Sequence, residues 1–423
     1  MRRAIITAAV MLFVIVGTGW AADAKYGDAA YYVDGESNNI HDAGLYHLKL
    51  TDALWVGSNT EGHGSGNYPG QTGVATLYIG QLWVGTDAFG APRVSGNFPY
   101  ASGGVEWHKT LGLLWSDGSS WNQRPSYITK RGALDSYLAA DDRDAKESGP
   151  IGLVVEQHGM QWSGAVNDDY IIFKYSVRNN SGRNLTNAFL CLYYDFDIGG
   201  STSYDDDYVH IDFGRKMPYM HDDETGHPYV GLRILDGKPH TMGVPSIMED
   251  PDTDLKKWQL MTSGLWTEKG EPHDWRICLS SGPHTCARNK TIQYGCAVVA
   301  GMNLSQLRAN SDAAYNRYWQ IYLGVEKFWA RAVPGAVELN WEPNSEYAGF
   351  NIYRSAANDP ARDVKINRNL ITGQKPFRYL DPSVAPGVEY AYELEAVTLN
   401  GAKERFGPVK AVATGKIKPA TFT

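Results

Sequence analysis

The sequence lacks the short motifs that mark the commonest catalytic sites, and it has few stretches typical of long helices. It contains no Cys-x-x-Cys-His run, which excludes covalently attached haem. It has neither a Gly-x-Ser-x-Gly elbow nor a His-Glu-x-x-His helix, so no familiar serine-hydrolase or zinc-protease site is indicated. Long runs of Leu, Ala, Glu and Lys are almost missing, which argues against a helical bundle.

An excess of positive charge is missing as well. The sequence has 39 Lys and Arg residues and 47 Asp and Glu residues, which gives a net charge of -8. A mildly acidic chain argues against nucleic acid or an anionic membrane as partner. No segment after residue 22 reaches the length of a membrane span.

Residues 1–22 have the pattern of a secretory signal peptide. Arg2 and Arg3 are followed by an apolar run over 4–16 and by small residues over 19–22, as the cleavage zone requires. Its removal would take away two arginines and no acid, so the net charge would move from -8 to -10. We therefore expect a secreted protein, extracellular or at the cell surface, with the periplasm as an alternative.

Glycine, tyrosine and tryptophan are abundant, with 45, 26 and 13 residues. Together with many runs of alternating polarity, this composition predicts an all-β protein with many turns. The expected organisation is an extended arm over 23–39, a large antiparallel β-sandwich over 40–331, a second sandwich over 332–414 and a tail over 415–423. One short helix is expected, from Asn303 or Ser305 to about Tyr318.

The most regular pattern lies between Trp162 and Gly200, where two strand-like runs flank a polar link over 179–184. Each run alternates with a period of two, as a strand with one buried face does. The expected inward faces are Ile171, Phe173, Tyr175 and Val177 in the first run, and Leu190, Leu192, Tyr194, Phe196 and Ile198 in the second. Because the link is rich in turn-forming residues, the segment is interpreted as a β-hairpin.

Acidic residues gather where the second run ends. They are Asp195 and Asp197 on one face of the strand and Asp205, Asp206 and Asp207 beyond a Gly/Ser loop. Carboxylates held close together need a cation or protons between them, and calcium is the hard, oxygen-preferring cation available outside cells. A structural calcium site is one hypothesis, although the spacing is not that of an EF-hand. The alternatives are solvated surface acids and one half of a glycosidase acid/base pair.

Four cysteines in an exported chain favour disulfides, for which three pairings are possible. The favoured pairing joins Cys278 to Cys286 across a short loop and Cys191 to Cys296 between strand-like runs. A zinc site formed by Cys278, His284 and Cys286 is an alternative, but the standard ligand spacings are missing.

Three tryptophans, Trp107, Trp115 and Trp121, fall among Gly, Ser and Asp residues in an irregular region. One interpretation is that they pin long loops to the core. The other is that they form an exposed platform for sugars, because aromatic faces stack on the apolar faces of sugar rings.

The C-terminal region carries a set of features that resembles a fibronectin type III domain. The features are PGAVELNWEP with Trp341, AGFNIYRS with Tyr353, FRYLD over 377–381, and PGVEYAYELEAV with Tyr390 at the tyrosine-corner position. The resemblance implies an immunoglobulin-like sandwich, and it names no partner.

The larger region is similar to uncharacterised N-terminal β-regions of secreted bacterial proteins that also carry fibronectin-type repeats. The similarity rests on LWVG over 82–85, PIGL over 150–153, YYDFDIG over 193–199, SSGP over 280–283 and NSDAA over 310–314. That group lends no general activity.

Taken together, the sequence predicts a secreted, non-catalytic β-protein with a structural or adhesive role at a bacterial surface or matrix. Its expected partners are other surface or matrix proteins, or glycans. The alternatives are a carbohydrate-binding protein, a glycoside-active enzyme, and a filament subunit whose arm over 23–39 adds a strand to a neighbouring copy.

Overall fold

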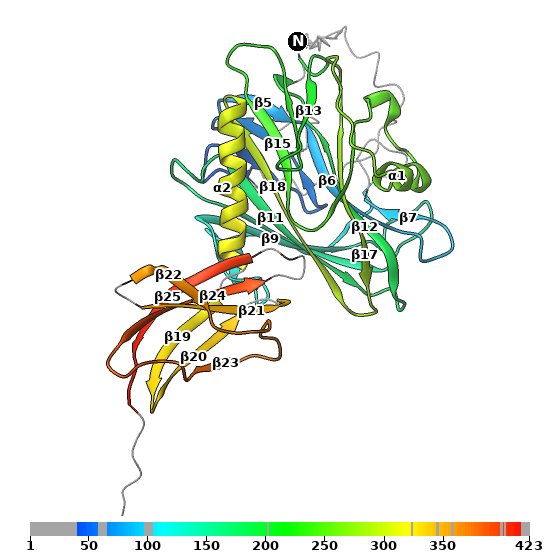
Figure 1. Cartoon of the computed structure of the whole chain (residues 1–423). Coiled ribbons are helices and arrows are strands. Elements are labelled where there is room, and N and C mark those ends of the chain that lie inside the picture. The colour runs from blue at the N-terminus through cyan, green and yellow to red at the C-terminus, as the bar shows by residue number, and fades with distance from the viewer. Residues whose placement is uncertain are drawn as a thin grey trace, which may run out of the picture.

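A computed structural model describes residues 40–415, except 58–65, 97–104, 201–202, 323–324, 344–346, 357–358, 398–400 and 402. The predicted signal peptide, the N-terminal arm and nearly all of the tail lie outside the described residues. The chain forms a large β-sandwich followed by a smaller one (Figure 1). The all-β fold class is therefore confirmed.

One layer of the large sandwich is an eight-stranded sheet in which every pair of neighbours is antiparallel. In spatial order its strands are β13 (Tyr208–Asp212), β14 (Met217–His221), β15 (Tyr229–Asp236), β18 (Thr291–Gly301), β11 (Tyr170–Asn179), β10 (Leu153–Gln161), β9 (Leu134–Asp141) and β8 (His108–Trp115).

The facing layer is a six-stranded sheet with β12 at its centre. Its strands are β16 (Pro239–Gly243), β17 (Ile277–Cys286), β12 (Leu185–Asp195), β6 (Ile79–Thr86) and β3 (Trp55–Val56), with β7 (Arg93–Ser95) paired to β6. A separate four-stranded sheet contains β1 (Ile40–His41), β2 (His47–Lys49), β4 (Gly66–Tyr68) and β5 (Val74–Leu77).

The main core lies between these two sheets and uses the alternation expected from the sequence. Phe173 of β11 and Leu192 of β12 are fully buried in one cluster with their i±2 neighbours. The residues that alternate with these along each strand, such as Ile172 and Tyr193, belong to two other clusters on the outer faces of the sheets. Both sheets are therefore buried on both faces over much of their area.

The expected hairpin between β11 and β12 is wrong. β11 pairs with β10 and β18 in one sheet, whereas β12 pairs with β6 and β17 in the other. The link between them crosses from sheet to sheet, and the buried Asn179 holds it by donating to the carbonyl oxygens of Arg183 at 2.8 Å and Cys286 at 2.9 Å. The two apolar faces meet across the core instead of lying side by side.

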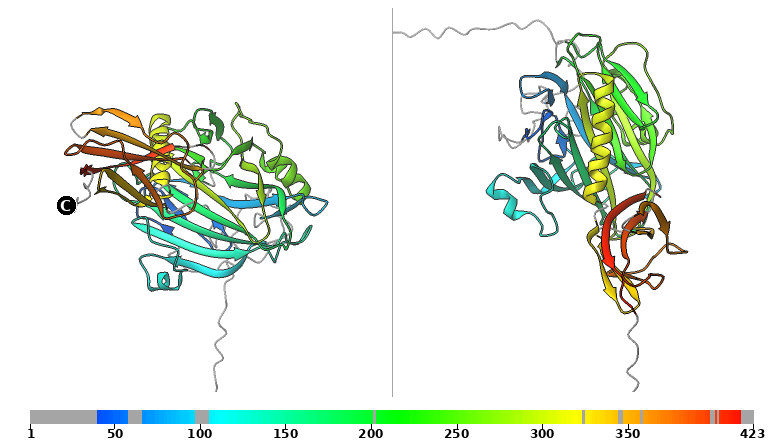
Figure 2. Two further views of the ribbon diagram at one scale, coloured as in Figure 1. Left: turned by 60° about the horizontal axis from the view of Figure 1, so that its bottom comes forward. Right: turned by 60° about the vertical axis from the view of Figure 1, so that its left-hand side comes forward.

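Two α-helices cover the outer faces of the sheets among the described residues. α2 (Leu304–Tyr322) runs along the eight-stranded sheet (Figure 2) and buries Leu307, Ala314 and Tyr318 against it. It starts where predicted, with the side chain of Asn303 accepting from the Gln306 amide at 3.0 Å, but it is longer than predicted. α1 (Asp254–Met261), which was not predicted, packs on the outer face of the six-stranded sheet; short 3-10 turns lie at Ser119–Gln123 and Ile247–Glu249.

The smaller sandwich has a three-stranded and a four-stranded sheet. The first contains β19 (Val325–Val333), β20 (Ala336–Pro343) and β23 (Phe377–Asp381); the second contains β22 (Asp359–Lys365), β21 (Gly349–Ala356), β24 (Glu389–Val397) and β25 (Lys403–Val412). Trp341, Phe350 and Tyr392 lie at its core. Its first strand begins at Val325, which is before the expected boundary at residue 332.

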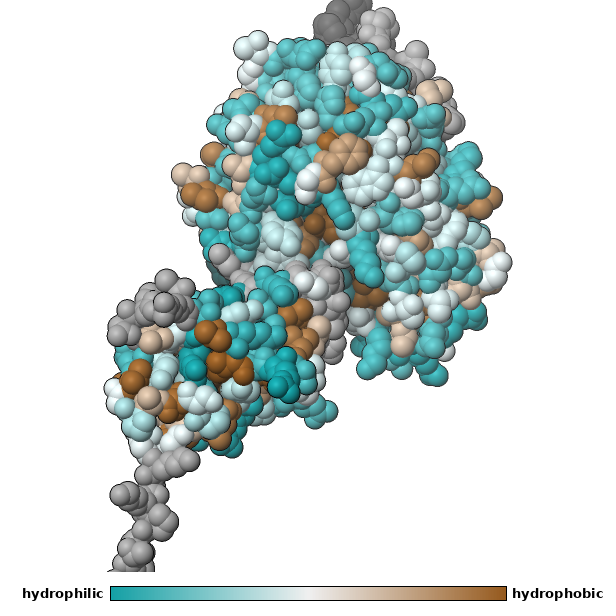
Figure 3. All heavy atoms as spheres, viewed as in Figure 1, coloured by the Kyte–Doolittle hydropathy of each residue, from teal (hydrophilic) through white to brown (hydrophobic). Residues whose placement is uncertain are grey.

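The outer surface of the large sandwich is mostly hydrophilic on the face shown in Figure 3, with isolated apolar side chains. Within the described part of the chain, no helix has the length and apolar character needed to cross a bilayer.

Candidate metal centre

Six carboxylates form two groups around the loops that follow β12 and β14 and precede β17. We call Asp195, Asp197 and Asp274 the arginine trio, because Arg276 lies among them, and Asp206, Asp207 and Asp222 the open trio. Within each trio, one ligand atom from each residue lies within 4.8 Å of the others. The backbone amide of His273 donates to the carbonyl oxygen of Asp207 at 3.1 Å, so the two trios adjoin.

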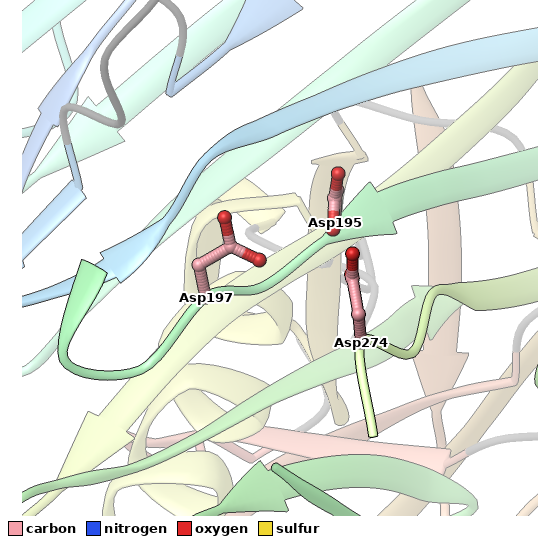
Figure 4. A group of neighbouring side chains, drawn as sticks. All are labelled: Asp195, Asp197 and Asp274. Carbon is pink, nitrogen blue, oxygen red and sulfur yellow. The ribbon is translucent and has the colours of Figure 1, made fainter. Parts of the chain in front are cut away.

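The end of β12 places the first two carboxylates. Asp195 is the last residue of the strand and points to the same face as Tyr193, while Phe196 stays in the core. Beyond it Asp197 turns its carboxylate toward the other two members of its trio (Figure 4). Gly199 and Gly200 have φ values of 85° and 76°, and a Cβ on Gly199 would lie 2.7 Å from the Cβ of Ser203. A glycine turn therefore brings the chain back toward Asp206 and Asp207.

Each trio is completed by a residue that the sequence did not indicate. Asp274 comes from the segment that leads into β17, and Asp222 directly follows β14. Asp222 lies opposite Asp207, just beyond the last pair of the β13–β14 hairpin, whereas Asp274 is distant in sequence and only the sheet topology brings it close. Of the five predicted ligands, four belong to a trio, whereas Asp205 is exposed and belongs to neither.

Arg276 provides the arginine trio with a fixed positive charge. Its Nη2 lies 2.8 Å from Asp195 Oδ2, its Nη1 pairs with Asp274, and its Nε lies 3.6 Å from Asp250 Oδ1. Arg276 is 4 % exposed and Asp195 is 1 % exposed. A buried carboxylate is tolerated only when charges and hydrogen bonds compensate it, and this guanidinium does so for part of the trio.

The compensation in the arginine trio is incomplete. Burial raises the pKa of Asp195 and of Asp197 well above the ordinary range, although Arg276 opposes the rise. Burial alone would lower the pKa of Arg276, but the carboxylates of Asp195, Asp250 and Asp274 hold that pKa above its ordinary value. The Oδ1 atoms of Asp195 and Asp197 are buried without a hydrogen-bond partner. A single arginine thus compensates several carboxylates, and only in part.

The open trio has no such guanidinium. Across the residues described, no lysine or arginine forms an ion pair with Asp206, Asp207 or Asp222. Asp207 is completely buried, and its Oδ2 accepts from the Ile198 amide at 3.2 Å. Asp206 Oδ2 accepts from the Ser203 hydroxyl at 2.8 Å. The Oδ1 atoms of both aspartates are buried and have no hydrogen-bond partner.

His227 is the only nearby base that contacts the open trio among the described residues, and its Nδ1 forms a hydrogen bond with Asp222 Oδ2. Burial raises the pKa of Asp207 well above its ordinary range, and the neighbouring carboxylates of Asp222 and Asp206 raise it further. Carboxylate oxygens are the donors that calcium prefers, and the Oδ1 atoms of Asp206 and Asp207 are unpartnered. Both oxygens of Asp222 already have partners, the Glu224 amide and His227. The open trio therefore fits a hard divalent cation better than the arginine trio does.

The favoured cysteine pairings are wrong. Cys278 and Cys286 lie near opposite ends of the extended strand β17, about 26 Å apart at about 3.3 Å per residue. Cys191 and Cys296 lie in different sheets and in different apolar clusters. The zinc alternative fails for the same reason, because Cys278 and Cys286 cannot share one ion.

The three tryptophans do not form an exposed platform. Trp107 is 1 % exposed and its Nε1 donates to the carbonyl oxygen of Leu82 at 3.2 Å. Trp121 is 8 % exposed within a small cluster, and Trp115 is partly buried against the main core. They anchor loops to the sandwich, as the first of the two interpretations held.

A Ser–His contact that the sequence did not indicate lies inside the large sandwich. His41 Nε2 is 2.8 Å from Ser136 Oγ, and the rings of Trp115 and Phe173 lie edge-on to the imidazole. Burial lowers the pKa of His41 to about 3. A nucleophile must be reached by substrate, but both residues are at most 1 % exposed, so the contact supports packing.

No family model and no curated protein matches the chain. Among solved structures, an Fn3-like protein from Clostridium thermocellum is 22 % identical and matches 22 % of this chain and 91 % of its own, with a TM-score of 0.17. A pectate lyase, Pel3 from Pectobacterium carotovorum, is 18 % identical, with coverages of 22 % and 28 % and a TM-score of 0.17. A polysaccharide lyase is 10 % identical, with coverages of 91 % and 46 % and a TM-score of 0.27. At these TM-scores the likenesses carry no argument about function.

Proposed function

We propose that the chain is an exported, non-catalytic β-sandwich protein with a structural or adhesive role, in which calcium at the open trio braces the large sandwich. The observation that carries the proposal is the completely buried carboxylate of Asp207, whose Oδ1 has no partner. Leaving such a charge uncompensated in a protein interior costs several kcal/mol, on the order of the stability of a whole domain.

Calcium suits this position better than other common cations. It accepts six to eight oxygen ligands in a flexible arrangement, so three carboxylates can be supplemented by backbone carbonyls and water. Magnesium demands a near-ideal octahedron and keeps most of its own water. A bound calcium would tie the loop that follows β12 to the loop that follows β14, just beyond the last pair of the β13–β14 ladder, Tyr208 with His221.

The smaller sandwich is proposed to be a fibronectin type III module. Its sheet orders, β19-β20-β23 and β22-β21-β24-β25, support this assignment, as does the tyrosine corner. There the Tyr390 hydroxyl accepts from the Ala385 amide at 3.1 Å. Such a module would act as a spacer or as a binding unit for matrix partners.

A thermal melt of the full chain tests the calcium proposal. A ligand that binds only the folded state, present at about 100 times its Kd, adds about 2.7 kcal/mol, or roughly 5–10 °C, to the transition of a domain of this size. We expect that rise with calcium over metal-stripped protein and a much smaller one with magnesium. Equal midpoints in calcium and in stripped buffer would contradict the proposal.

Carbohydrate binding is the second candidate, favoured by a stacked aromatic pair in which Phe213 is exposed and Trp266 is half-buried. The rings of Phe213 and Trp266 are nearly parallel, with 29° between planes and 6.3 Å between centroids. Phe213 is 61 % exposed, and the indole is fixed because Trp266 Nε1 donates to the carbonyl oxygen of His240 at 3.0 Å. Fixed aromatic faces of this kind can stack on sugar rings.

A glycan array separates the two candidates. If the aromatic pair binds sugar, the Phe213→Ala variant loses array binding and keeps the calcium-dependent rise in melting temperature. Tyr127→Ala, which removes another highly exposed ring, serves as the matched control. An array without binding by the unaltered chain rejects the carbohydrate candidate and leaves the calcium proposal intact.

A further inference from the structure

Two cysteines lie side by side on the outer face of the six-stranded sheet. Cys191 of β12 pairs in register with Ser280 of β17, and Tyr193 pairs with Cys278, so the two cysteines occupy diagonal positions on the same face. Their Sγ atoms are 3.0 Å apart. Both residues are completely buried in the cluster that also contains Trp83 and Tyr193.

The other two cysteines have no comparable neighbour among the described residues. Cys286 lies near the far end of β17, where its Sγ donates to the carbonyl oxygen of Lys290 at 3.3 Å. Cys296 lies on β18 in the opposite sheet and faces the main core. Among the described residues, Cys191 and Cys278 are therefore the one pair of cysteines whose sulfur atoms the packing of the strands brings together.

We propose that Cys191 and Cys278 form a disulfide when the chain folds in an oxidising compartment, while Cys286 and Cys296 remain thiols. A disulfide has an S–S distance of about 2.0 Å, so the sulfurs need to approach by about 1 Å. Side-chain rotation achieves this without a change of sheet register. Diagonal cross-strand positions are about 7–8 Å apart, near the upper limit for such a bond, and the Sγ separation of 3.0 Å shows that these two side chains turn toward each other. Positions near opposite ends of one strand are too far apart.

The oxidation requires a disulfide donor, such as a thiol–disulfide oxidoreductase or oxidised glutathione. The thiolate of one cysteine attacks the donor disulfide, which forms a mixed disulfide and releases one donor thiol. The second cysteine, after losing its proton, displaces the other donor thiol. The donor is reduced by two electrons, and the two cysteine protons end on the two donor thiols. Because both sulfurs are buried in the folded chain, the reaction occurs before β12 and β17 are fully covered.

The bond would clamp the two strands that deliver the arginine trio. Asp195 ends the strand that contains Cys191, and Arg276 directly precedes the strand that contains Cys278. A covalent link between these strands would hold the Arg276–Asp195 pair in place whether or not a cation is bound. The inference is thus independent of the calcium proposal.

Peptide mapping of the full chain, produced through export, tests the pairing. The protein is denatured, its free thiols are alkylated, and it is digested without reduction before mass spectrometry. We expect a Cys191 peptide joined to a Cys278 peptide, and alkylated Cys286 and Cys296. Alkylation of Cys191 and Cys278, or a link from either to another cysteine, would overturn the inference.

Reduction gives a second readout. Loss of a native disulfide should lower the melting midpoint of the unaltered chain by roughly 5–15 °C when a reductant is added. The Cys286→Ala control should keep that sensitivity, and the double variant Cys191→Ala with Cys278→Ala should lose it. A double variant that still responds to reductant would contradict the pairing. If this variant does not fold, the peptide map of the unaltered chain decides alone.

Discussion

The two acidic trios use the same kind of side chain in the same region of the fold, yet only one of them contains its own countercharge. In the arginine trio, the guanidinium of Arg276 lies 2.8 Å from Asp195 and also pairs with Asp274. In the open trio, the buried Asp207 relies on the Ile198 amide. The difference indicates where the fold can do without a cation and where it lacks a compensating charge.

The smaller sandwich supplies a third case, in which each buried acid has a local partner. Asp381 accepts from Arg354 at 2.8 Å and from the Tyr392 hydroxyl at 3.0 Å. Glu338 is covered by the side chains of Arg331 and Arg378, and it is therefore only 2 % exposed. Acids compensated in this way need no ion, so calcium sensitivity should be confined to the large sandwich.

The largest expected effect comes from removing the arginine of the arginine trio. Arg276→Met leaves several buried carboxylates without a countercharge, which should cost about 3–5 kcal/mol in urea denaturation of the metal-stripped protein. Calcium should recover part of the loss, because the trio would then resemble the open one. Arg354→Met in the smaller sandwich is the matched control, with an expected loss of about 1 kcal/mol. Equal losses of stability for the two variants would show that burial of the arginine trio does not determine the cost of removing the arginine.

Asp207→Asn should have effects of opposite sign in the two metal states. The amide can keep the bond from Ile198 while removing the buried charge, so the stripped protein should gain about 1 kcal/mol. In calcium, the variant should lose most of the 5–10 °C rise in melting midpoint expected for the unaltered chain. Differential scanning calorimetry in both buffers measures the two effects. A variant that keeps the full rise would place the cation elsewhere.

A change of pH is expected to alter the stability difference between calcium-loaded and metal-stripped protein by less than these substitutions do. The folded-state pKa values of Asp195, Asp197 and Asp207 are raised by burial, so their contribution to stability is complete below about pH 4 and is lost as pH rises through those raised values. Stripped protein should therefore gain stability relative to calcium-loaded protein as the pH is lowered from 8 to 5.5. Thermal melts of stripped and calcium-loaded protein across this range measure the difference in stability directly. A stability difference that widens as the pH falls would contradict the assignment of raised pKa values to these carboxyl groups.

The smallest effect is expected in the smaller sandwich. Asp381→Asn weakens the pair with Arg354 and should cost about 1 kcal/mol, equally in calcium and in stripped buffer. Urea denaturation in the two buffers provides the measurement. A calcium-dependent difference would mean that the smaller sandwich also takes part in binding.

The sequence predicted the parts of the fold that depend on local alternation. Ile171 and Leu190, with their i±2 neighbours, lie in the core as expected. It did not predict that β11 and β12 lie in different sheets, because a turn-rich link can join two strands of one sheet or cross between two sheets. The choice depends on pairings with β6, β10, β17 and β18, most of which are distant in sequence.

The same limit applies to the candidate site. Asp195, Asp197, Asp206 and Asp207 were predicted because they lie close together along the chain. Asp274 was missed, since only the order of strands brings its loop to the end of β12. Asp222 was missed because it meets Asp207 through the register of the β13–β14 hairpin. The cysteine pairing failed similarly, because the proximity of Cys191 and Cys278 is a property of strand register.

A crystal of the full chain grown with calcium tests the central claim most directly, through an anomalous difference map. The account predicts a peak at the open trio, with carboxylate oxygens of Asp206, Asp207 and Asp222 at about 2.3–2.6 Å. Its coordination should be completed by further oxygen atoms. A map with no peak there, or with calcium bound only to exposed acids elsewhere, would contradict the account.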